Sequence, residues 1–276
     1  MFWKRLMSSA VLVVFALIFL LSGGIWLGAV TTVLSMIAFR ELMHACGVEE
    51  NGGIGQLEWV GYAGIFLYGL SMTLTRDFSL GLAILVFLFL GEMFVYVFRF
   101  PVYKSQQIMT SFFCAFYPSV LFFFIYLTRE LTHGIYLVWL IFISSWICDT
   151  CAYLAGMAFG RHKLAPVLSP KKSVEGAVGG AVGSALVGAL FAGIFLLPVR
   201  EDRSVVWVAA LICAVGAVIS QVGDLAASAI KRNHEIKDYG KLIPGHGGIM
   251  DRFDSVLFTA PVIYYLSVVL LRVGFA

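Results

Sequence analysis

Two polar stretches in the second half of the chain combine the residue types that handle phosphate groups. Residues 160–176 and 231–254 mix lysine, arginine, glycine and acidic residues within an otherwise apolar sequence. Each stretch follows an apolar segment that carries a carboxylate, Asp149 before the first and Asp224 before the second. An ionisable residue in a membrane helix costs roughly 2.5 to 3.5 kcal/mol on insertion scales, so it usually faces a bundle interior or a watery cavity and has a function. We therefore expect these segments to converge on one cytoplasmic cavity.

A further constellation lies around the start of the second stretch. On a helix, Asp224, Ser228 and Lys231 stand at positions i, i+4 and i+7 and share one face. Such a face presents a carboxylate, a hydroxyl and an ammonium group together. The pattern predicts a ligand that needs all three.

A glycine-rich run leads into the last apolar segment. Gly245, Gly247 and Gly248 precede Asp251 and Asp254, which would share a face in the first turns of a helix. Glycine lets backbone N–H groups approach phosphate oxygens, and a helix N-terminus favours an anion. Carboxylates opposite such a nest can hold Mg2+, which typically takes only one or two carboxylates together with substrate phosphates. The combination indicates metal-assisted phosphoryl or nucleotidyl transfer.

Each part of this pattern also has a purely structural interpretation. Asp251 and Asp254 could merely cap a helix. The basic pairs at residues 171–172 and 231–232 could mark the membrane side of helix ends, and His246 could be a turn residue. Structural use alone would not require intramembrane aspartates beside a glycine-rich loop, so the joint occurrence favours a site.

Four more titratable residues lie within predicted spans, namely Arg40, Glu41, His44 and Glu92. Arg40 and Glu41 are adjacent and do not share a helix face, so we expect them to have separate partners. Arg40 with Glu92 is one candidate pair. A structural ion pair is favoured over catalysis for this group, whose role the sequence does not assign.

The composition places all of these residues in a membrane protein. Of the 276 residues, 61% are hydrophobic and 13% are charged, and the mean hydropathy is +0.94. A spanning helix needs roughly 20 apolar residues, so about nine spans would leave short connections and no separate soluble domain. The small net charge of +3, without a polybasic tail, argues against nucleic acid as a partner.

The five cysteines do not form the disulfide framework of a small secreted domain. Cys148 and Cys151 make a CxxC pattern, but it lies inside an apolar segment without a βαβ context. Helix packing is therefore favoured over redox chemistry for these two residues.

The apolar runs predict an all-α, polytopic integral membrane protein with about nine transmembrane helices. They cover residues 6–21, 25–45, 59–74, 78–98, 108–127, 135–159, 177–199, 205–230 and 256–271. Of the 19 Lys and Arg residues, thirteen fall on one side of this map, five fall on the other and Arg40 lies inside a span; cytoplasmic connections carry the positive excess. We therefore expect a cytoplasmic amino terminus, with the first run as a span rather than a signal peptide.

Two regions follow from this map. Residues 1–130 would form the N-terminal transmembrane helices, a scaffold with candidate dimer contacts. Residues 131–276 would form the C-terminal transmembrane catalytic region with its two cytoplasmic loops.

The polar residues of the second stretch carry a specific resemblance. They comprise Ser228, Lys231, Arg232, Lys237, Asp238, Gly240 and the run IPGHGGIMDRFD at residues 243–254. This pattern looks like the complete signature of the phosphatidate cytidylyltransferases, also called CDP-diacylglycerol synthases. Upstream, the family's second characteristic stretch is matched by Asp149, Tyr153, Gly156 and the run SPKKSVEG at residues 169–176.

The resemblance is detailed in the second half of the chain, whereas the first half matches only as a set of hydrophobic helices. Two positions depart from the family pattern. Ser173 stands where many members have threonine, and Met157 stands where many have a basic residue. The second departure removes one candidate phosphate contact.

The resemblance implies a magnesium-dependent reaction in which CTP and phosphatidate give CDP-diacylglycerol and pyrophosphate, for phospholipid biosynthesis. It implies a multi-pass, homodimeric enzyme of the cell inner (cytoplasmic) membrane, with the active site facing the cytoplasm. The residues agree with this, because CTP arrives from the cytosol, the lipid phosphate arrives from the leaflet, and the basic loops lie where the two meet.

The expected mechanism is direct in-line transfer without a covalent enzyme intermediate, so catalysis is mainly positioning and charge neutralisation. The candidate catalytic residues are Asp149, Lys171, Lys172, Asp224, Lys231 and Asp251. The candidate substrate-binding residues are Ser169, Ser228, Arg232, Lys237, Asp238, His246, Gly247, Gly248 and Arg252. The candidate ligands of Mg2+ are Asp224, Asp251 and Asp254, and a second cation is expected to fit beside the first. Asp149 could either orient a basic residue or bind metal.

Two other classes of function stay open at this point. The nearer is a CTP-dependent lipid kinase or a cytidylyltransferase for another membrane lipid, which shares substrates. The more distant is a transporter, because intramembrane charges and broken helices also mark ion paths. Against a transporter, the chain lacks obvious repeated halves and concentrates its charge at cytoplasmic helix ends.

Overall fold

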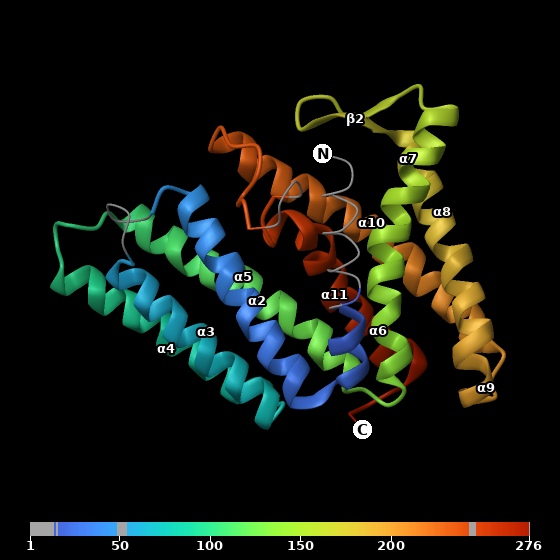
Figure 1. Ribbon diagram of the computed structural model, residues 1–276, viewed down its shortest axis with the longest axis horizontal. Coiled ribbons are helices and arrows are strands. Elements are labelled where there is room, and N and C mark those ends of the chain that lie inside the picture. The colour runs from blue at the N-terminus through green and yellow to red at the C-terminus, as the bar shows by residue number, and fades with distance from the viewer. Residues whose placement is uncertain (1–13, 15, 49–53, 243–246, 276) are drawn as a thin grey trace. The chain divides into compact units, whose positions relative to one another are not determined.

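The computed structural model describes residues 14, 16–48, 54–242 and 247–275. The described residues fall into two compact units, the first within the ranges Met1–Tyr126 and His234–Arg252 and the second within Leu127–Asn233 and Phe253–Ala276. Nearly all of the described secondary structure is helical (Figure 1). The first predicted span, residues 6–21, lies largely outside the described residues.

The first unit contains four long helices. They are α2 (Gly24–Ala45), α3 (Gln56–Leu74), α4 (Phe78–Phe98) and α5 (Ser105–Arg129). Helix α3 packs against both α2 and α4. Gly61 allows the Phe39 ring of α2 to pack on the α3 backbone, because a Cβ atom at this position would overlap the ring. The Tyr126 hydroxyl of α5 donates to the Thr73 carbonyl of α3 at 3.0 Å.

Helix α4 shows why this unit belongs in a membrane. It exposes large apolar side chains along its length, including Leu82, Phe87, Phe94 and Val97. In water such a surface would be unfavourable, whereas lipid tails are as apolar as the side chains and can cover it.

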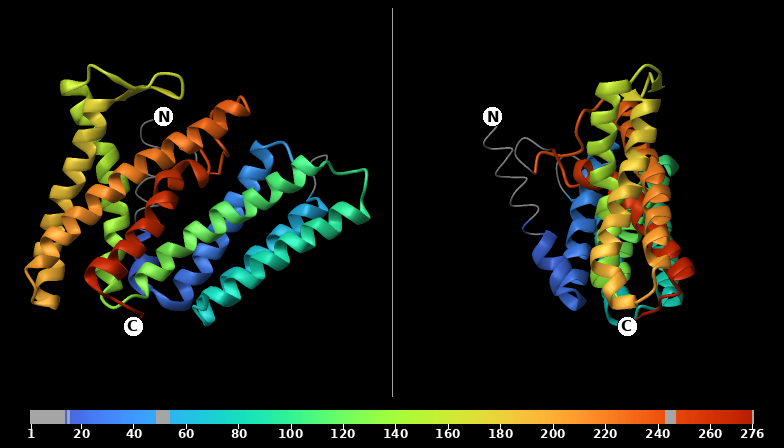
Figure 2. Two further views of the ribbon diagram at one scale, coloured as in Figure 1. Left: turned by 180° about the vertical axis from the view of Figure 1, so that it is seen from behind. Right: turned by 90° about the vertical axis from the view of Figure 1, so that its right-hand side faces the viewer.

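The second unit contains the remaining elements. Along the chain they are α6 (Gly134–Phe142), η1 (Ile143–Ile147), α7 (Cys148–Phe159), β1 (Lys163–Ala165), β2 (Ser169–Ser173), α8 (Val174–Phe191), η2 (Ala192–Leu196), α9 (Leu197–Arg200), α10 (Ser204–Asn233) and α11 (Met250–Leu271), whose first three residues belong to the first unit. Helices α7 and α8 run side by side, and α10 packs on α8 (Figures 1 and 2).

Small residues set the contact between α7 and α8. A Cβ atom at Gly179 would overlap Ala155, and one at Gly183 would overlap Cys151. Gly180 packs in the same way against Cys148. Small residues let membrane helices approach closely, where packing contacts replace the hydrophobic effect. Both cysteines lie at this contact as free thiols, which agrees with the helix-packing interpretation of the CxxC pattern.

Seven of the helical segments are long and apolar enough to cross a membrane, within the part of the chain that the structure describes. They correspond to seven of the predicted runs, extended by up to several residues at their ends. The run at residues 59–74 also forms a helix, α3, but Gln56 and Glu58 at its start make it less apolar than the others. The all-α polytopic prediction is confirmed, while the count of nine spans and the cytoplasmic amino terminus stay predictions.

One element was not predicted. Strands β1 and β2 pair antiparallel, with Lys163 opposite Ser173 and Ala165 opposite Ser169. They form a short hairpin between the C-terminal end of α7 and the N-terminus of α8 (Figure 2). These strands of three and five residues are too short and too polar for an alternating apolar pattern to reveal them.

Candidate active site

Lys172 and Asp224 bring two distant polar segments of the second unit together. Lys172 lies in β2, and its ammonium group forms an ion pair with Asp224 of α10. Both side chains are partly exposed. The ion pair connects the hairpin to the helix that carries the carboxylate, hydroxyl and ammonium face, and the Lys172 Nζ atom itself is buried.

A pocket of about 290 Å³ lies beside this ion pair. Lys171, Lys172 and Asp149 provide its charged lining, while Tyr153 and Met157 of α7 provide apolar lining. A pocket with ammonium groups at one part and apolar side chains at another suits an amphipathic phosphate ester.

The N-terminus of α8 also lines this pocket. Ser173 precedes the helix, and its hydroxyl accepts the Gly176 N–H at 3.1 Å. Gly176 and Gly156 let α8 and α7 approach closely here, because a Cβ atom at Gly176 would be 2.7 Å from the Ala152 carbonyl oxygen. A helix N-terminus and two lysines together favour an anion.

The hairpin is held in place by Glu175, in the first turn of α8. Its carboxylate accepts the backbone N–H groups of Arg161, at 3.1 Å, and His162, at 3.2 Å. The His162 ring also contacts it, with 2.6 Å between Nδ1 and Oε1. These bonds connect the start of the hairpin to the helix that follows it.

Asp254 adds a third carboxylate in this unit. It is 8% exposed, and it lies within electrostatic range of Asp224, Lys231 and Asp149. Gly223 allows α10 and α11 to approach, because a Cβ atom there would be 2.9 Å from the Asp254 carbonyl oxygen. Three helices thus contribute one carboxylate each, and lysines partly offset the negative charge.

The carboxylates fit only one kind of metal site. Among the described residues, no three His, Cys, Asp or Glu side chains are grouped closely enough to hold a metal ion jointly. Mg2+ commonly binds through one or two carboxylates, with substrate phosphates and water completing its shell. A metal site here would have to draw on substrate phosphates, and the expectation that Asp224 and Asp254 bind Mg2+ stays a prediction.

Asp251 is held differently, within the first unit. Its Oδ2 accepts the N–H groups of Tyr239, at 2.8 Å, and Gly248, at 3.0 Å. Gly247 has a φ of 84°, which favours glycine, and a Cβ atom there would be 2.7 Å from the same oxygen. Asp251 thus holds the backbone at Tyr239 and Gly248, which is not the helix cap that the structural interpretation of this residue suggested, and its expected metal and catalytic roles stay predictions.

Comparison with known proteins identifies the family. The sequence model of the cytidylyltransferase family matches residues 3–270. A phosphatidate cytidylyltransferase of Staphylococcus saprophyticus is 32% identical, over 96% of this chain and 98% of that protein. The enzymes of the same name from Staphylococcus aureus and Staphylococcus epidermidis are 31% and 30% identical, with the same shares covered. The chain belongs to the cytidylyltransferase family. It is therefore an enzyme, a nucleotidyltransferase.

The predicted site residues of this cytidylyltransferase occupy three kinds of position. Asp149, Lys171 and Lys172 line the pocket, and Asp224 and Asp254 lie within electrostatic range of Asp149. Ser169, Ser228 and Lys231 are half-buried on β2 and α10, whereas the exposed ones are Arg232, Lys237, Asp238 and Arg252. Gly248 is buried, Gly247 is half-buried, and His246 lies outside the described residues. The catalytic and binding roles of these residues stay predictions.

The expected pair of Arg40 and Glu92 is wrong. Glu92 is fully buried, and its Oε1 accepts the Ser111 hydroxyl of α5 at 2.8 Å. Arg40 is exposed. Arg40 on α2 therefore lies on an exposed face, and Glu92 on α4 lies on a buried one. Residue spacing within each helix does not show which face is buried against another helix.

Glu41 is the residue of this cytidylyltransferase that sequence reasoning missed. Its two carboxylate oxygens accept the N–H groups of Ile249 and Met250, at 3.0 Å and 2.8 Å. The one signal in the sequence is a carboxylate in an apolar span with no Lys or Arg three or four residues away. Its separate partner agrees with the expectation that Arg40 and Glu41 diverge.

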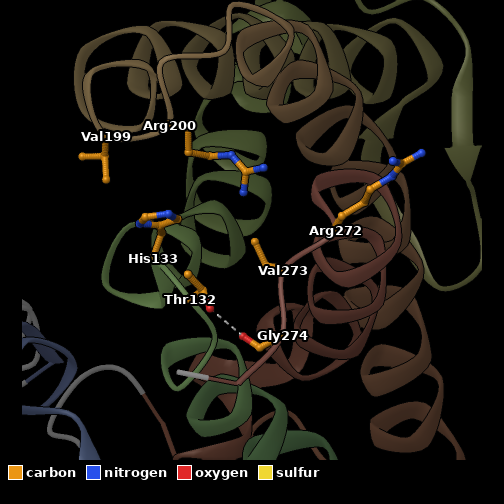
Figure 3. A pocket seen from close by; sticks show the side chains of 7 residues that line it. All are labelled: Thr132, His133, Val199, Arg200, Arg272, Val273 and Gly274. Carbon is orange, nitrogen blue, oxygen red and sulfur yellow. Dashed lines mark hydrogen bonds between the residues drawn. The ribbon is translucent and has the colours of Figure 1, made fainter.

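The second unit has another pocket. It has a volume of about 280 Å³ and is lined by residues that include His133, Arg200 and Arg272. The Arg200 side chain donates to the Leu271 carbonyl oxygen at 2.8 Å, at the C-terminal end of α11. Figure 3 shows Arg272 pointing away from Arg200. The two guanidinium groups therefore do not converge on a ligand.

Proposed function

We propose that this cytidylyltransferase transfers a cytidylyl group from CTP to phosphatidate and releases pyrophosphate. The relatives carry the name phosphatidate cytidylyltransferase, and they match the chain nearly end to end. The observation that carries the proposal is the pocket at the N-terminus of α8, where Lys171 and Lys172 lie beside Asp149 and apolar side chains. CDP-diacylglycerol, the product, would serve phospholipid biosynthesis.

The reaction needs little covalent chemistry from the protein. A phosphate oxygen of phosphatidate attacks the α-phosphorus of CTP, and the bond from this phosphorus to the β-phosphate oxygen breaks. Lys171 and Lys172 bind phosphate oxygens and offset their charge, and Lys231 adds to this charge from α10. Asp224 orients Lys172, as the ion pair between them supports. Positioning of the two phosphates then supplies much of the rate enhancement.

Mg2+ is the proposed cofactor, and a second cation is proposed beside it. Asp224 and Asp254 are its proposed ligands, together with Asp251, one turn before Asp254 on α11. The ion would neutralise charge on the triphosphate as pyrophosphate leaves. Asp149 either supports this site or orients a lysine.

We propose a homodimer in the inner, cytoplasmic membrane, with the active site facing the cytoplasm. The excess of Lys and Arg in the connections that carry the site residues supports this orientation. CTP would then reach the pocket from the cytosol, and phosphatidate from the adjacent leaflet.

Product analysis with labelled CTP tests the proposal. Purified protein is incubated with phosphatidate, Mg2+ and CTP labelled at the α-phosphate, and lipid and water-soluble products are separated. We expect label in the lipid and release of unlabelled pyrophosphate. With label at the γ-phosphate in a parallel reaction, a lipid that carries only this phosphate would mean a lipid kinase. Absence of transfer to any lipid would favour the transporter interpretation.

A further inference from the structure

A carboxylate from α2 completes the hydrogen bonding at the start of α11. Glu41 is 9% exposed, and it accepts the N–H of Ile249 through Oε1 and that of Met250 through Oε2. Because α11 begins at Met250, these donors lie at the helix end whose N–H groups lack partners within the helix. The acceptor comes from a position 208 residues earlier in the chain than Ile249.

The backbone around this carboxylate is shaped to admit it. A Cβ atom at Gly248 would overlap the Glu41 carboxyl group, and a Cβ atom at Gly240 would do the same. Gly248 also donates its N–H to Asp251 at 3.0 Å. Two carboxylates, Glu41 and Asp251, thus hold one short segment of backbone, residues 248–250.

The closeness of the two carboxylates argues that Glu41 does more than stabilise a helix. Asp251 lies within electrostatic range of Glu41, and two like charges destabilise each other. The backbone N–H groups and the positive end of the helix dipole offset part of this cost. Because the two carboxylates hold the same backbone, residues 248–250, a change at Glu41 would affect Asp251 as well as the helix end.

We propose that Glu41 is a positioning residue of the transfer reaction. It fixes the backbone of residues 248–250, and this backbone sets the position of the Asp251 carboxylate. This role rests on the proposed function, because the kinetic test of Glu41 requires cytidylyl transfer.

Glu41→Gln tests this proposal with little change in volume. The amide retains one acceptor oxygen, but its NH2 group faces a backbone N–H and cannot accept it. Loss of such a charge-assisted bond corresponds to roughly a 10- to 100-fold decrease in kcat. The KM for CTP should change much less, because Glu41 is expected to act only through the loop.

Hydrogen exchange provides a readout that does not depend on activity. In Glu41→Gln, the amides of residues 247–252 should exchange about tenfold faster or more, since one backbone bond is lost. Glu41→Asp, which retains both oxygens and the charge, should recover part of kcat. Wild-type exchange and wild-type kcat in Glu41→Gln would overturn the proposal.

Glu58→Gln is the matched control. Glu58 is 2% exposed and accepts the Gly55 N–H at 2.8 Å, at the start of α3. The substitution Glu58→Gln should leave kcat and the hydrogen exchange of residues 247–252 unchanged. Equal losses of kcat in both variants, in step with equal decreases of Tm, would mean that Glu41 is only structural. If the wild type transfers no cytidylyl group, the proposed function fails, while the exchange experiment still decides whether Glu41 holds the loop.

Discussion

At the scale of single residues, the site is defined by the interactions of Lys172 with two acidic side chains. Lys172 forms an ion pair with Asp224 and lies within electrostatic range of Asp149. The Lys172 side chain is partly exposed along its length, but its Nζ atom is buried beside Asp224. A phosphate would therefore have to displace the Asp224 carboxylate to bind the ammonium group.

We expect Lys172→Ala to lower kcat/KM by about 100-fold or more, because an ammonium group on a transferring phosphate is worth several kcal/mol. Lys104→Ala is the matched control, since Lys104 is an exposed lysine between α4 and α5. It should retain activity within about threefold, as surface changes usually do. Steady-state kinetics with CTP as the varied substrate measures both. Equal losses would favour a topological role for Lys172.

Asp251→Asn separates charge from loop geometry. The amide oxygen can still accept the N–H groups of Tyr239 and Gly248, so the loop should be retained. If the carboxylate holds Mg2+, turnover should fall by about 100-fold or more, with Tm and detergent-solubilised yield near wild type. Near-normal turnover at saturating Mg2+ would show that Asp251 serves the loop alone.

At the scale of elements, the pocket depends on how closely α7 and α8 pack. Gly179, Gly180 and Gly183 bring α8 against Ala155 and the two cysteines of α7. Glu175 then fixes the hairpin relative to the first turn of α8. Lys171 and Lys172 therefore reach the pocket because small residues and the Glu175 carboxylate hold α7, the hairpin and α8 together.

Gly179→Val should separate α7 from α8, because its Cβ would overlap Ala155. Overpacking of this kind typically costs 1–3 kcal/mol, so we expect a lower Tm in detergent. We also expect activity to fall at temperatures at which the variant is still folded, because the pocket is distorted. Val178→Ala is the control on the same helix turn, since Val178 is 59% exposed. Thermal unfolding and activity are measured for both variants. Wild-type Tm and activity in Gly179→Val would show that close packing of α7 and α8 does not support the pocket.

At the scale of the whole molecule, the chain is a multi-pass membrane enzyme. Its long helices expose apolar side chains that lipid can cover, and its site residues gather at helix ends and connections. The proposed orientation puts the hairpin in the cytoplasm and the connection before α10 on the opposite side.

Cysteine labelling of intact cells tests this orientation. An impermeant thiol reagent should label Arg203→Cys, in the connection before α10, and should not label Arg161→Cys, before β1, until the membrane is opened. The unsubstituted chain shows the labelling that its five native cysteines contribute. Labelling of Arg161→Cys from outside would reverse the proposed topology.

The sequence by itself determined the class of protein, most helix positions and the family. Hydropathy and the SPKKSVEG and IPGHGGIMDRFD runs are properties of neighbouring residues, so they can be read without a fold. The hairpin was not predicted because its strands are short and polar. The bond from Glu175 of α8 to Arg161, just before the hairpin, is also a contact that the sequence does not show.

Only the tertiary structure decided which distant side chains meet. Glu41 with Ile249 and Met250, Glu92 with Ser111, and Lys172 with Asp224 are contacts between separate helices or strands. Sequence spacing fixes the face that a residue occupies on its own helix, but the rotation and packing of each helix decide what this face contacts. For this reason the expected pair of Arg40 and Glu92 was wrong, and the carboxylate that holds the glycine-rich loop became visible only in the folded chain.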